Sequence, residues 1–443
     1  MKMTTEGILR MAPGDGRLVY EEAPGFEGSW ALISQAGEGG QWKQADSKKI
    51  HEGLFEIADL ENGADYIIRL EKPDGNGSWP RLFRCGVFPG TVINYIHPED
   101  KTFFPSGMCT ASPSLVRYGK RLILSHDIFF RDMAQNQSRI FYSDDEGANW
   151  RLLSELEGCF WGKLFIYDGK LYMLANTHEY GDLVLYRTET EGKSWTGACT
   201  VIKGGNNING GPHKSAIPML LHNGRIWTAV EYGSWFQGGH ACGTASAAGD
   251  ITDASNWVVS EFLEYDPTWP GTPIGKSSGC IEGNILVKPD GQLIDFLRFG
   301  IDACTPNYGK ALYLNLDKNN PGAAPEFGKV VDFHGNHSKF TILYDASTER
   351  YWTITSRADH EKPRRRNELV LMSSKNVEDW TIEKTLLDYE HTGWHEDDLK
   401  AGLQYVDFVF SGDYIHYVSR TALNGALNYH DSNCITFHTV KYK

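Results

Sequence analysis

The segment that most constrains the fold is a turn, Ser143–Trp150. Ser143 and Asp145 have short polar side chains that can hydrogen-bond nearby backbone amides. Gly147 permits the positive φ that a tight turn needs. Trp150 then returns the chain to the apolar side and covers the turn. Together these residues predict a closed hairpin turn between two strands.

The same turn recurs in degraded form, and each copy ends on a tryptophan. The recurrences are Thr188–Trp195, Asp250–Trp257 and Ser373–Trp380. A period of about 45–60 residues with strand-rich units is typical of a β-propeller. The predicted fold class is therefore all-β.

Six shorter turns, each containing Gly or Asp, subdivide residues 91–443 into hairpins. They are 118–120, 167–169, 222–224, 289–291, 345–347 and 411–413. Six turns predict six blades, and five blades is the alternative. The last unit is one strand short, and the early strand 91–96 is predicted to complete it. This pairing would join the ends of the ring and leave no open sheet edge.

Residues 1–88 have a different pattern, with short alternating strands between Gly, Pro and Asn turns. The segment Leu60–Tyr66 resembles the turn before the late Tyr strand of fibronectin type III domains. We therefore expect a small fibronectin type III-like β-sandwich over 1–88 and a propeller over 89–443.

Composition excludes several classes of partner. The net charge of −14 argues against nucleic acid or an anionic membrane as a partner. The N-terminus has no apolar signal core and no run approaches a membrane span, so a cytoplasmic protein is expected, or a secreted one if a signal was removed. The 8 Cys are scattered without a Cys-x-x-Cys pair, which predicts reduced core thiols.

Function in a propeller is expected where first strands begin and second strands end, because the loops there line one mouth of the channel. Polar side chains occur at these places that a packed core would not choose. The candidate substrate-binding residues among them are His126, Asp127, Glu231, Arg298, Lys339, Arg357, Arg366 and Arg420.

The predicted blades and the Asp-box turns, also called BNR repeats, resemble the bacterial sialidase (neuraminidase) family over about residues 108–443. Glu282 and Arg298 stand on consecutive strands of one hairpin, so they are expected at the same end of the channel. In sialidases, a Glu and an Arg have this arrangement. The resemblance implies that Glu282 is the base for a tyrosine nucleophile and that Arg298 binds the substrate carboxylate.

Three further residues match the family's catalytic positions. Tyr405 opens the last unit and is similar to the family's nucleophile. Asp132 precedes the first Asp box and matches the acid/base carboxyl, and Arg366 matches the later carboxylate-binding arginine. Because Arg364 and Arg365 adjoin Arg366, the sequence leaves open which of the three faces the pocket.

One residue departs from the family pattern. Sialidases carry an Arg in a Phe/Tyr-Arg-Ile-Pro motif of the first blade, and Ala111 stands at that position here. A missing charge-assisted contact of this kind is worth about 1.5–3 kcal/mol. The substrate is therefore predicted to be an acidic sugar other than sialic acid.

The sequence favours an exo-acting glycoside hydrolase that retains anomeric configuration, with Tyr405, Glu282 and Asp132 as catalytic residues. A lyase acting on uronic-acid glycans and a non-catalytic glycan-binding propeller remain as alternatives. No cofactor is expected, because no phosphate loop or dinucleotide motif is present. No metal site is expected either, since His334 and His337 with His360 or His430 lack clean ligand spacing.

Overall fold

The computed structural model describes residues 3–37, 41–101, 107–131, 133–335, 337–362, 366–391 and 397–443. Almost all of the regular structure is β-strand. Three one-turn 3-10 helices also occur: η1 (Trp235–Gln237), η2 (Ala254–Asn256) and η3 (Tyr389–His391). Within these ranges, no helix has the length and apolar character needed to cross a membrane.

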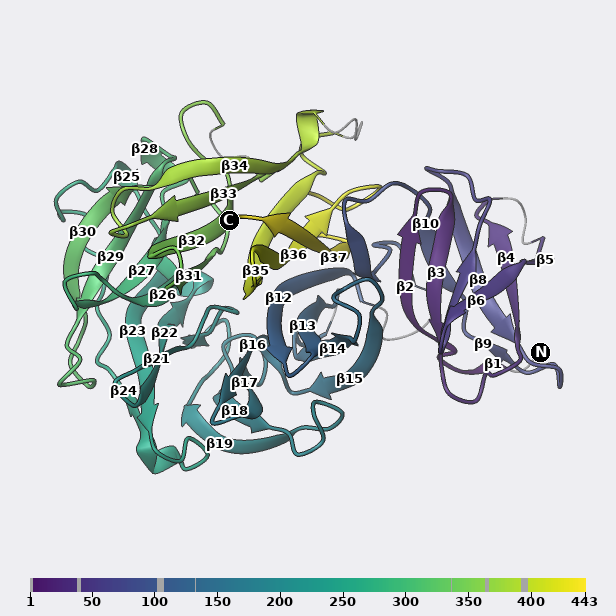
Figure 1. Ribbon diagram of the computed structural model, residues 1–443, viewed down its shortest axis with the longest axis horizontal. Coiled ribbons are helices and arrows are strands. Elements are labelled where there is room, and N and C mark those ends of the chain that lie inside the picture. The colour runs from purple at the N-terminus through teal and green to yellow at the C-terminus, as the bar shows by residue number, and fades with distance from the viewer. Residues whose placement is uncertain are drawn as a thin grey trace.

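The first part of the chain forms two sheets, which occupy the right side of Figure 1. One sheet has the order β1 (Met3–Thr5), β9 (Gly77–Ser78), β8 (Asp65–Glu71), β4 (Trp30–Gln35) and β5 (Lys43–Gln44), with β10 (Arg81–Arg84) also paired to β8. The other has the order β2 (Ile8–Gly14), β3 (Arg17–Glu22), β7 (Leu54–Ile57) and β6 (Ser47–His51). Strand β8 alternates buried and half-buried residues, and its Tyr66, Ile68 and Leu70 share one core with Leu18 of the other sheet.

Six more sheets follow along the chain and are arranged around a common centre (Figure 1). The first three are β12 (Cys109–Tyr118), β13 (Arg121–Phe129), β14 (Gln137–Ser143), β15 (Arg151–Glu157); β16 (Phe160–Tyr167), β17 (Lys170–Asn176), β18 (Leu183–Arg187), β19 (Thr196–Ile202); and β20 (Gly211–His213), β21 (Leu220–His222), β22 (Arg225–Ser234), β23 (Gly239–Ala248), β24 (Trp257–Val259). Each is an antiparallel meander, so its strands succeed one another from the centre outward.

The remaining three sheets repeat this layout. They are β26 (Gly279–Val287), β27 (Leu293–Gly300), β29 (Lys310–Leu316), β30 (Glu326–Asp332); β31 (Thr341–Asp345), β32 (Arg350–Ser356), β33 (Glu368–Ser374), β34 (Thr381–Asp388); and β35 (Gly402–Ser411), β36 (Tyr414–Ala422), β37 (Cys434–Lys441), β11 (Thr91–Tyr95). A separate two-stranded ribbon joins β25 (Ile274–Lys276) to β28 (Ala303–Thr305).

The last sheet contains the closure predicted from the sequence. Strand β11 comes from the start of this region, and it pairs antiparallel with β37 at the end of the chain, with Thr91 opposite Phe437 and Tyr95 opposite Cys434. The six predicted hairpin turns also each fall between the first-strand segment and the second strand of one of these sheets. The turns follow from local turn residues, and β11 pairs the strand β37 that would otherwise be an open edge of the last sheet.

The Ser143–Trp150 turn is closed by its own side chains. Gly147 N donates to Ser143 Oγ at 2.9 Å, and Asn149 N donates to Asp145 Oδ1 at 2.9 Å. The indole of Trp150 donates to Gly147 O at 3.1 Å. The second copy repeats this pattern with Thr188, Gly192 and Trp195 in the places of Ser143, Gly147 and Trp150.

We expect Trp150→Ala to lower the free energy of unfolding by about 3–5 kcal/mol, because the side chain is fully buried and its ring packs against Phe437 with 5.5 Å between centroids. Phe437 lies on β37, so this contact also ties the first sheet to the closing one. Urea unfolding measures the change. The matched variant Trp195→Ala, at a half-buried position, should lose less, and an equal loss at both sites would contradict this account.

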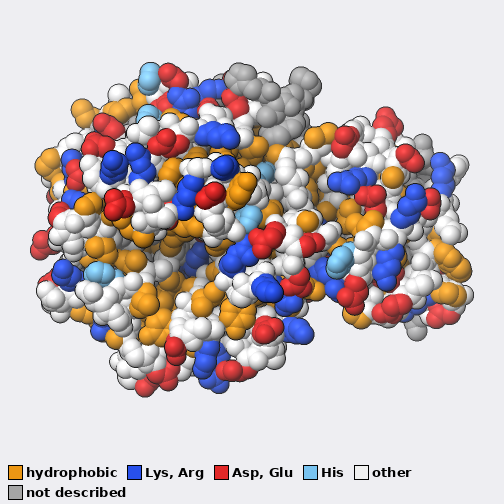
Figure 2. Space-filling model, viewed as in Figure 1, with side chains coloured by type: hydrophobic (Ala, Val, Ile, Leu, Met, Phe, Trp, Pro, Cys, Tyr) orange, Lys and Arg blue, Asp and Glu red, His pale blue; other side chains and the backbone are white. Residues whose placement is uncertain are grey.

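Neither the charged side chains seen in Figure 2 nor the cysteines gather in one dominant cluster. Acidic and basic side chains alternate over the face seen in Figure 2, which therefore carries no field of one sign. All 8 cysteines are free, and all but Cys199 are buried, in agreement with the expectation of core thiols.

Candidate active site

Four of the first strands share one irregularity near their beginnings. Strands β12, β16, β26 and β35 each slip in register against the second strand of their sheet. The residues inside these bulges have left-handed backbones: Ser112 (φ 42), Trp161 (φ 57), Glu282 (φ 62) and Tyr405 (φ 53). A β-bulge re-aims side chains, and such strain in non-glycine residues concentrates at functional sites.

Two of these bulge residues meet through an arginine. Arg298 Nη1 lies 2.7 Å from Glu282 Oε2 and 3.5 Å from the Tyr405 hydroxyl. Glu282 and Arg298 come from the fourth sheet, and Tyr405 comes from the sixth. The structure therefore brings a carboxylate and a guanidinium of one sheet together with a phenol of another.

The carboxyl of Glu282 is ionised at neutral pH. Burial raises its pKa, but Arg298, His213 and Lys339 outweigh this and hold the pKa below its ordinary value. The side chain is only 4% exposed and also accepts a hydrogen bond from Ser215 Oγ at 3.4 Å. An ionised carboxylate beside a phenol is suited to accept the phenolic proton.

Two further arginines face the Tyr405 ring. The guanidinium carbon of Arg420 lies 5.2 Å from the ring centroid, and that of Arg366 lies 5.9 Å from it. Arg366 donates to Gln404 Oε1 at 2.6 Å. Burial lowers the pKa of Arg366, and the nearby charges of Arg298 and Arg420 lower it further. Arg298, Arg366 and Arg420 thus form a cluster around Tyr405, which we call the arginine cluster.

Arg420 has unused hydrogen-bonding capacity. It is only 2% exposed, yet its Nε and Nη2 have no hydrogen-bond partner within the described part of the chain. A buried guanidinium in this state is costly unless an anion completes it. The site is therefore suited to an anionic group.

The position of Ala111 explains the departure from the sialidase motif. Ala111 is fully buried and lies opposite Asp127 in the β12–β13 pairing, so no long side chain would fit there without displacing the core. Arg420 lies on β36 opposite Gln404, next to the Tyr405 bulge. The third arginine of this site therefore comes from the last sheet instead of the first.

Other predicted residues lie apart from the arginine cluster or have other partners. His126 is fully buried, and both its ring nitrogens are bonded, to Asn94 Nδ2 at 3.1 Å and to Asp127 O at 2.9 Å. Arg357 is held by Asp359, Glu361 and Glu368. These contacts leave neither side chain directed at Tyr405.

Asp127 and Lys339 are committed to the scaffold. Asp127 accepts from Trp161 N at 2.9 Å and from Ser138 Oγ at 2.5 Å, and burial raises its pKa to about 7. Lys339 is fully buried and donates to Ala216 O at 2.8 Å, and burial lowers its pKa to about 8. Asp132, Arg364 and Arg365 lie outside the described residues.

Both carboxylate oxygens of Glu231 have hydrogen-bond partners. Oε1 accepts from Gly283 N at 3.2 Å, next to the strained Glu282, and Oε2 lies 3.0 Å from His213 Nδ1. Glu231 is 1% exposed. This buried carboxylate therefore supports Gly283 and His213 and is not exposed to a substrate.

Sequence reasoning gave no role to two residues that border the site. The His430 ring lies 6.2 Å from the Tyr405 ring, nearly perpendicular to it, and bonds Asp431 Oδ1 at 2.9 Å. Burial and the charge of Arg420 lower the pKa of His430 to about 4. Trp161 packs on His213 with 4.3 Å between ring centroids. The sequence could have identified Trp161 by its place near the start of a first strand, because Glu282 has the same place in its own strand.

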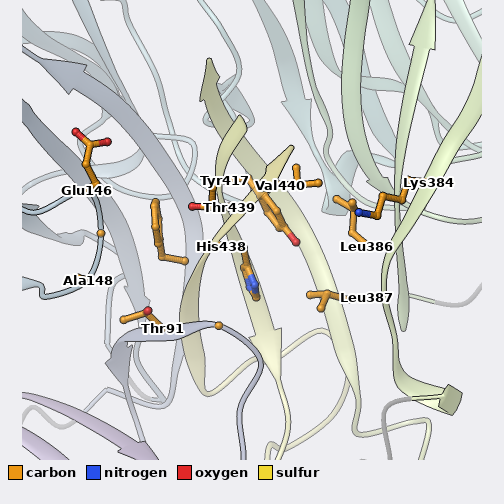
Figure 3. Close-up of a pocket in the computed structure, with 13 residues that line it drawn as sticks. Thr91, Glu146, Ala148, Lys384, Leu386, Leu387, Tyr417, His438, Thr439 and Val440 are labelled. Atoms are coloured by element: carbon orange, nitrogen blue, oxygen red, sulfur yellow. The ribbon is translucent and has the colours of Figure 1, made fainter. Parts of the chain in front are cut away.

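A separate cavity of about 500 Å³ lies away from these residues, between β34, β37 and the 146–148 turn (Figure 3). Its wall includes Tyr417 stacked on His438 at 4.7 Å, and His438 is bonded to Thr436 at 2.8 Å. The wall has none of the arginine–phenol geometry, so the arginine cluster remains the candidate active site.

No family model matches this chain, and no curated protein matches it in sequence. Among solved structures it is similar to the Hadza microbial sialidase Hz136, with 10% identity, a TM-score of 0.51, and coverage of 100% of this chain and 94% of that one. It is also similar to Trypanosoma rangeli sialidase in complex with sialic acid, with 12% identity, a TM-score of 0.50, and coverage of 84% and 56%. The chain therefore has the all-β, propeller-type fold of these sialidase structures.

Proposed function

We propose that this protein is an exo-acting glycoside hydrolase that removes a terminal acidic sugar with retention of configuration. The observation that carries the proposal is the Tyr405 hydroxyl, which shares Arg298 with the ionised Glu282 while Arg366 and Arg420 face its ring. A phenol beside a base, ringed by cations, is a nucleophile placed for an anionic substrate.

The proposed architecture is a six-bladed, sialidase-like propeller over 89–443 behind a fibronectin type III-like sandwich over 1–88. The six meander sheets and the β11–β37 closure support the blade count. The closed Ser143–Trp150 turn and its copy support Asp-box repeats. We assign no catalytic group to the sandwich, because the residues that converge all come from the propeller.

In the first half of the proposed reaction the arginine cluster binds the substrate carboxylate. The Tyr405 oxygen attacks the anomeric carbon while Glu282 takes the phenolic proton, and the bond to the leaving oxygen breaks. A neutral nucleophile avoids the repulsion that a carboxylate nucleophile would meet from an anionic sugar. In the second half, water attacks the same carbon, and Glu282 returns the proton to Tyr405.

A proton donor for the leaving oxygen is also required. The family resemblance assigns this role to Asp132.

A product screen tests the reaction class. Sialylated and uronic-acid glycans are incubated with the protein, and the products are weighed. Hydrolysis adds one water across the broken bond and yields a free acidic sugar. Products without added water, carrying an ultraviolet-absorbing double bond, would overturn the hydrolase and establish the lyase. Binding without any product would leave a glycan-binding propeller.

The lyase alternative has one observation in its favour. A base must remove the proton next to the carboxylate while cations neutralise the acid, and Tyr405 with the arginine cluster could do this as well. It leaves the ionised Glu282 without a role, because a Tyr405 that removes a proton must act as a phenolate, and a nearby carboxylate disfavours that charged form. We therefore favour hydrolysis.

We expect Arg420→Met to lower kcat/KM for the acidic sugar about 10–150-fold, the equivalent of about 1.5–3 kcal/mol for one lost charge-assisted contact. Folding stability should stay the same or rise, because a buried guanidinium with unpartnered nitrogens is removed. Steady-state kinetics and urea unfolding measure both. Arg117→Met, which removes a surface pair with Glu146, is the control. Unchanged kinetics in Arg420→Met would exclude this arginine from substrate binding.

A further inference from the structure

We propose that His213, oriented by Glu231, is the residue that gives a proton to the leaving oxygen and later takes one from water. This inference rests on the proposed glycosidase function and replaces Asp132 in that step. It is carried by the contact of His213 with Glu231 and by the contact of the neighbouring Ser215 with Glu282.

The contact between Glu231 and His213 uses one ring nitrogen, Nδ1, and leaves Nε2 for another partner. His213 on β20 lies opposite Glu231 on β22, and Nδ1 is 3.0 Å from Glu231 Oε2. Because the Glu231 carboxylate accepts a hydrogen bond from Nδ1, it fixes a proton on that nitrogen. Nε2 has no hydrogen-bond partner among the residues that the structure describes, so it is available to a substrate.

The ring is held rigidly. Trp161, one of the strained bulge residues, packs on it at 4.3 Å, and His240 lies 5.2 Å away. Glu231 is anchored by Gly283 N at 3.2 Å. His213 itself is only 5% exposed. A general acid needs this kind of fixed position, because proton transfer depends on distance and alignment.

His213 and Tyr405 come from different sheets. His213 belongs to the third sheet along the chain and Tyr405 to the sixth. Ser215, two residues after His213, donates to Glu282 Oε1 at 3.4 Å, so this segment borders the reaction centre. A sugar between them would present its anomeric carbon to Tyr405 and its leaving oxygen towards His213.

Every proton released in the two proposed steps is taken up by a named group. In the first step the Nε2 proton of the imidazolium moves to the glycosidic oxygen as its bond to carbon breaks, while the phenolic proton moves to Glu282. In the second step neutral Nε2 takes a proton from the attacking water, and the Tyr405–sugar bond breaks as Glu282 returns its proton. Asp127 is a poorer donor, because Trp161 N and Ser138 Oγ already occupy its two oxygens.

Leaving-group dependence tests the assignment. Two glycosides of the acidic sugar found in the product screen are compared, with 4-methylumbelliferone and lactose as leaving groups. His213→Gln should lose about 10²–10⁴-fold in kcat/KM on the lactose glycoside, which needs protonation, and less than about tenfold on the other. Azide, which needs no general base to attack the glycosyl-enzyme, should restore turnover of the activated substrate by this variant.

Matched variants separate catalysis from folding. Glu231→Gln should give a smaller loss with the same leaving-group dependence, since it only orients His213. His240→Gln changes a neighbouring ring that bonds Tyr180 at 3.3 Å and should show no such dependence. If Asp132→Asn shows the leaving-group pattern and His213→Gln does not, the inference is overturned.

Two outcomes keep this inference apart from the proposed function. Equal losses on both substrates without azide rescue in His213→Gln would indicate a purely structural role and overturn it, even if the enzyme is a glycosidase. Wild-type protein that hydrolyses neither glycoside would refute the proposed function itself.

Discussion

Tyr405→Phe is expected to lower kcat on the order of 10⁴-fold or more, while the melting temperature changes by no more than about 2 °C. The phenylalanine keeps the ring that Arg366 and Arg420 face, and it removes only the oxygen. Among the described residues, that oxygen makes one long hydrogen bond, 3.5 Å from Arg298 Nη1, so little stability depends on it. Turnover of an aryl glycoside and thermal melting measure the two effects.

Tyr417→Phe is the matched control for this variant. Tyr417 is buried in the same sheet, but it stacks on His438 at 4.7 Å and lies apart from the arginine cluster. It should retain wild-type turnover. If Tyr405→Phe keeps a turnover close to that of Tyr417→Phe, then Tyr405 is not the nucleophile.

Glu282→Gln is expected to lower kcat about 10²–10⁴-fold, because the amide cannot take the phenolic proton. It should also cost about 1.5–3 kcal/mol of folding free energy, since Arg298 loses its carboxylate partner at 2.7 Å inside the protein. Kinetics and urea unfolding report the two changes separately.

The pH dependence has a definite sign. Catalysis requires ionised Glu282, and Arg298 keeps its folded pKa below the usual 4.5 after offsetting the effect of burial. The acid limb of the wild-type pH–rate profile should therefore lie below pH 4.5 and vanish in Glu282→Gln. The same shift contributes stability above pH 4.5, and this contribution is lost as pH falls through the lower folded value. An acid limb well above pH 4.5 would contradict the assignment.

Features of the fold that depend on neighbouring residues could be predicted from the sequence. Gly and Asp at the hairpin turns and Trp150 after the Ser143 turn act within a few residues, and they marked the sheets correctly. The closing strand 91–95 followed from counting strands, because the last unit was one strand short and an unpaired sheet edge is unfavourable. The bulges could not be found in this way.

The bulges decide which side chains face the mouth. One extra residue reverses the alternation of a strand, so Ser112 rather than Ala111 is in the strained position. On the neighbouring β13, His126 and Asp127 face opposite ways by the ordinary alternation of a strand, and His126 packs on Phe141. A sequence alone does not show where such a bulge falls.

Site residues were predictable where one hairpin carries both partners. Glu282 and Arg298 belong to one β26–β27 hairpin and meet as expected. The role of Arg420 depends on contacts between β36 and the Tyr405 bulge. Arg357 looked equally suitable in sequence, but carboxylates of its own loop hold it. Such competition between partners is a property of the folded structure.

The most direct measurement is to trap the intermediate. A fluorinated analogue of the acidic sugar, with an activated leaving group and slowed second step, is incubated with the protein, which is then digested and weighed. The account predicts one peptide heavier by the sugar, containing Tyr405, and no such adduct in Tyr405→Phe. An adduct on Glu282, or inverted product with no adduct, would contradict it.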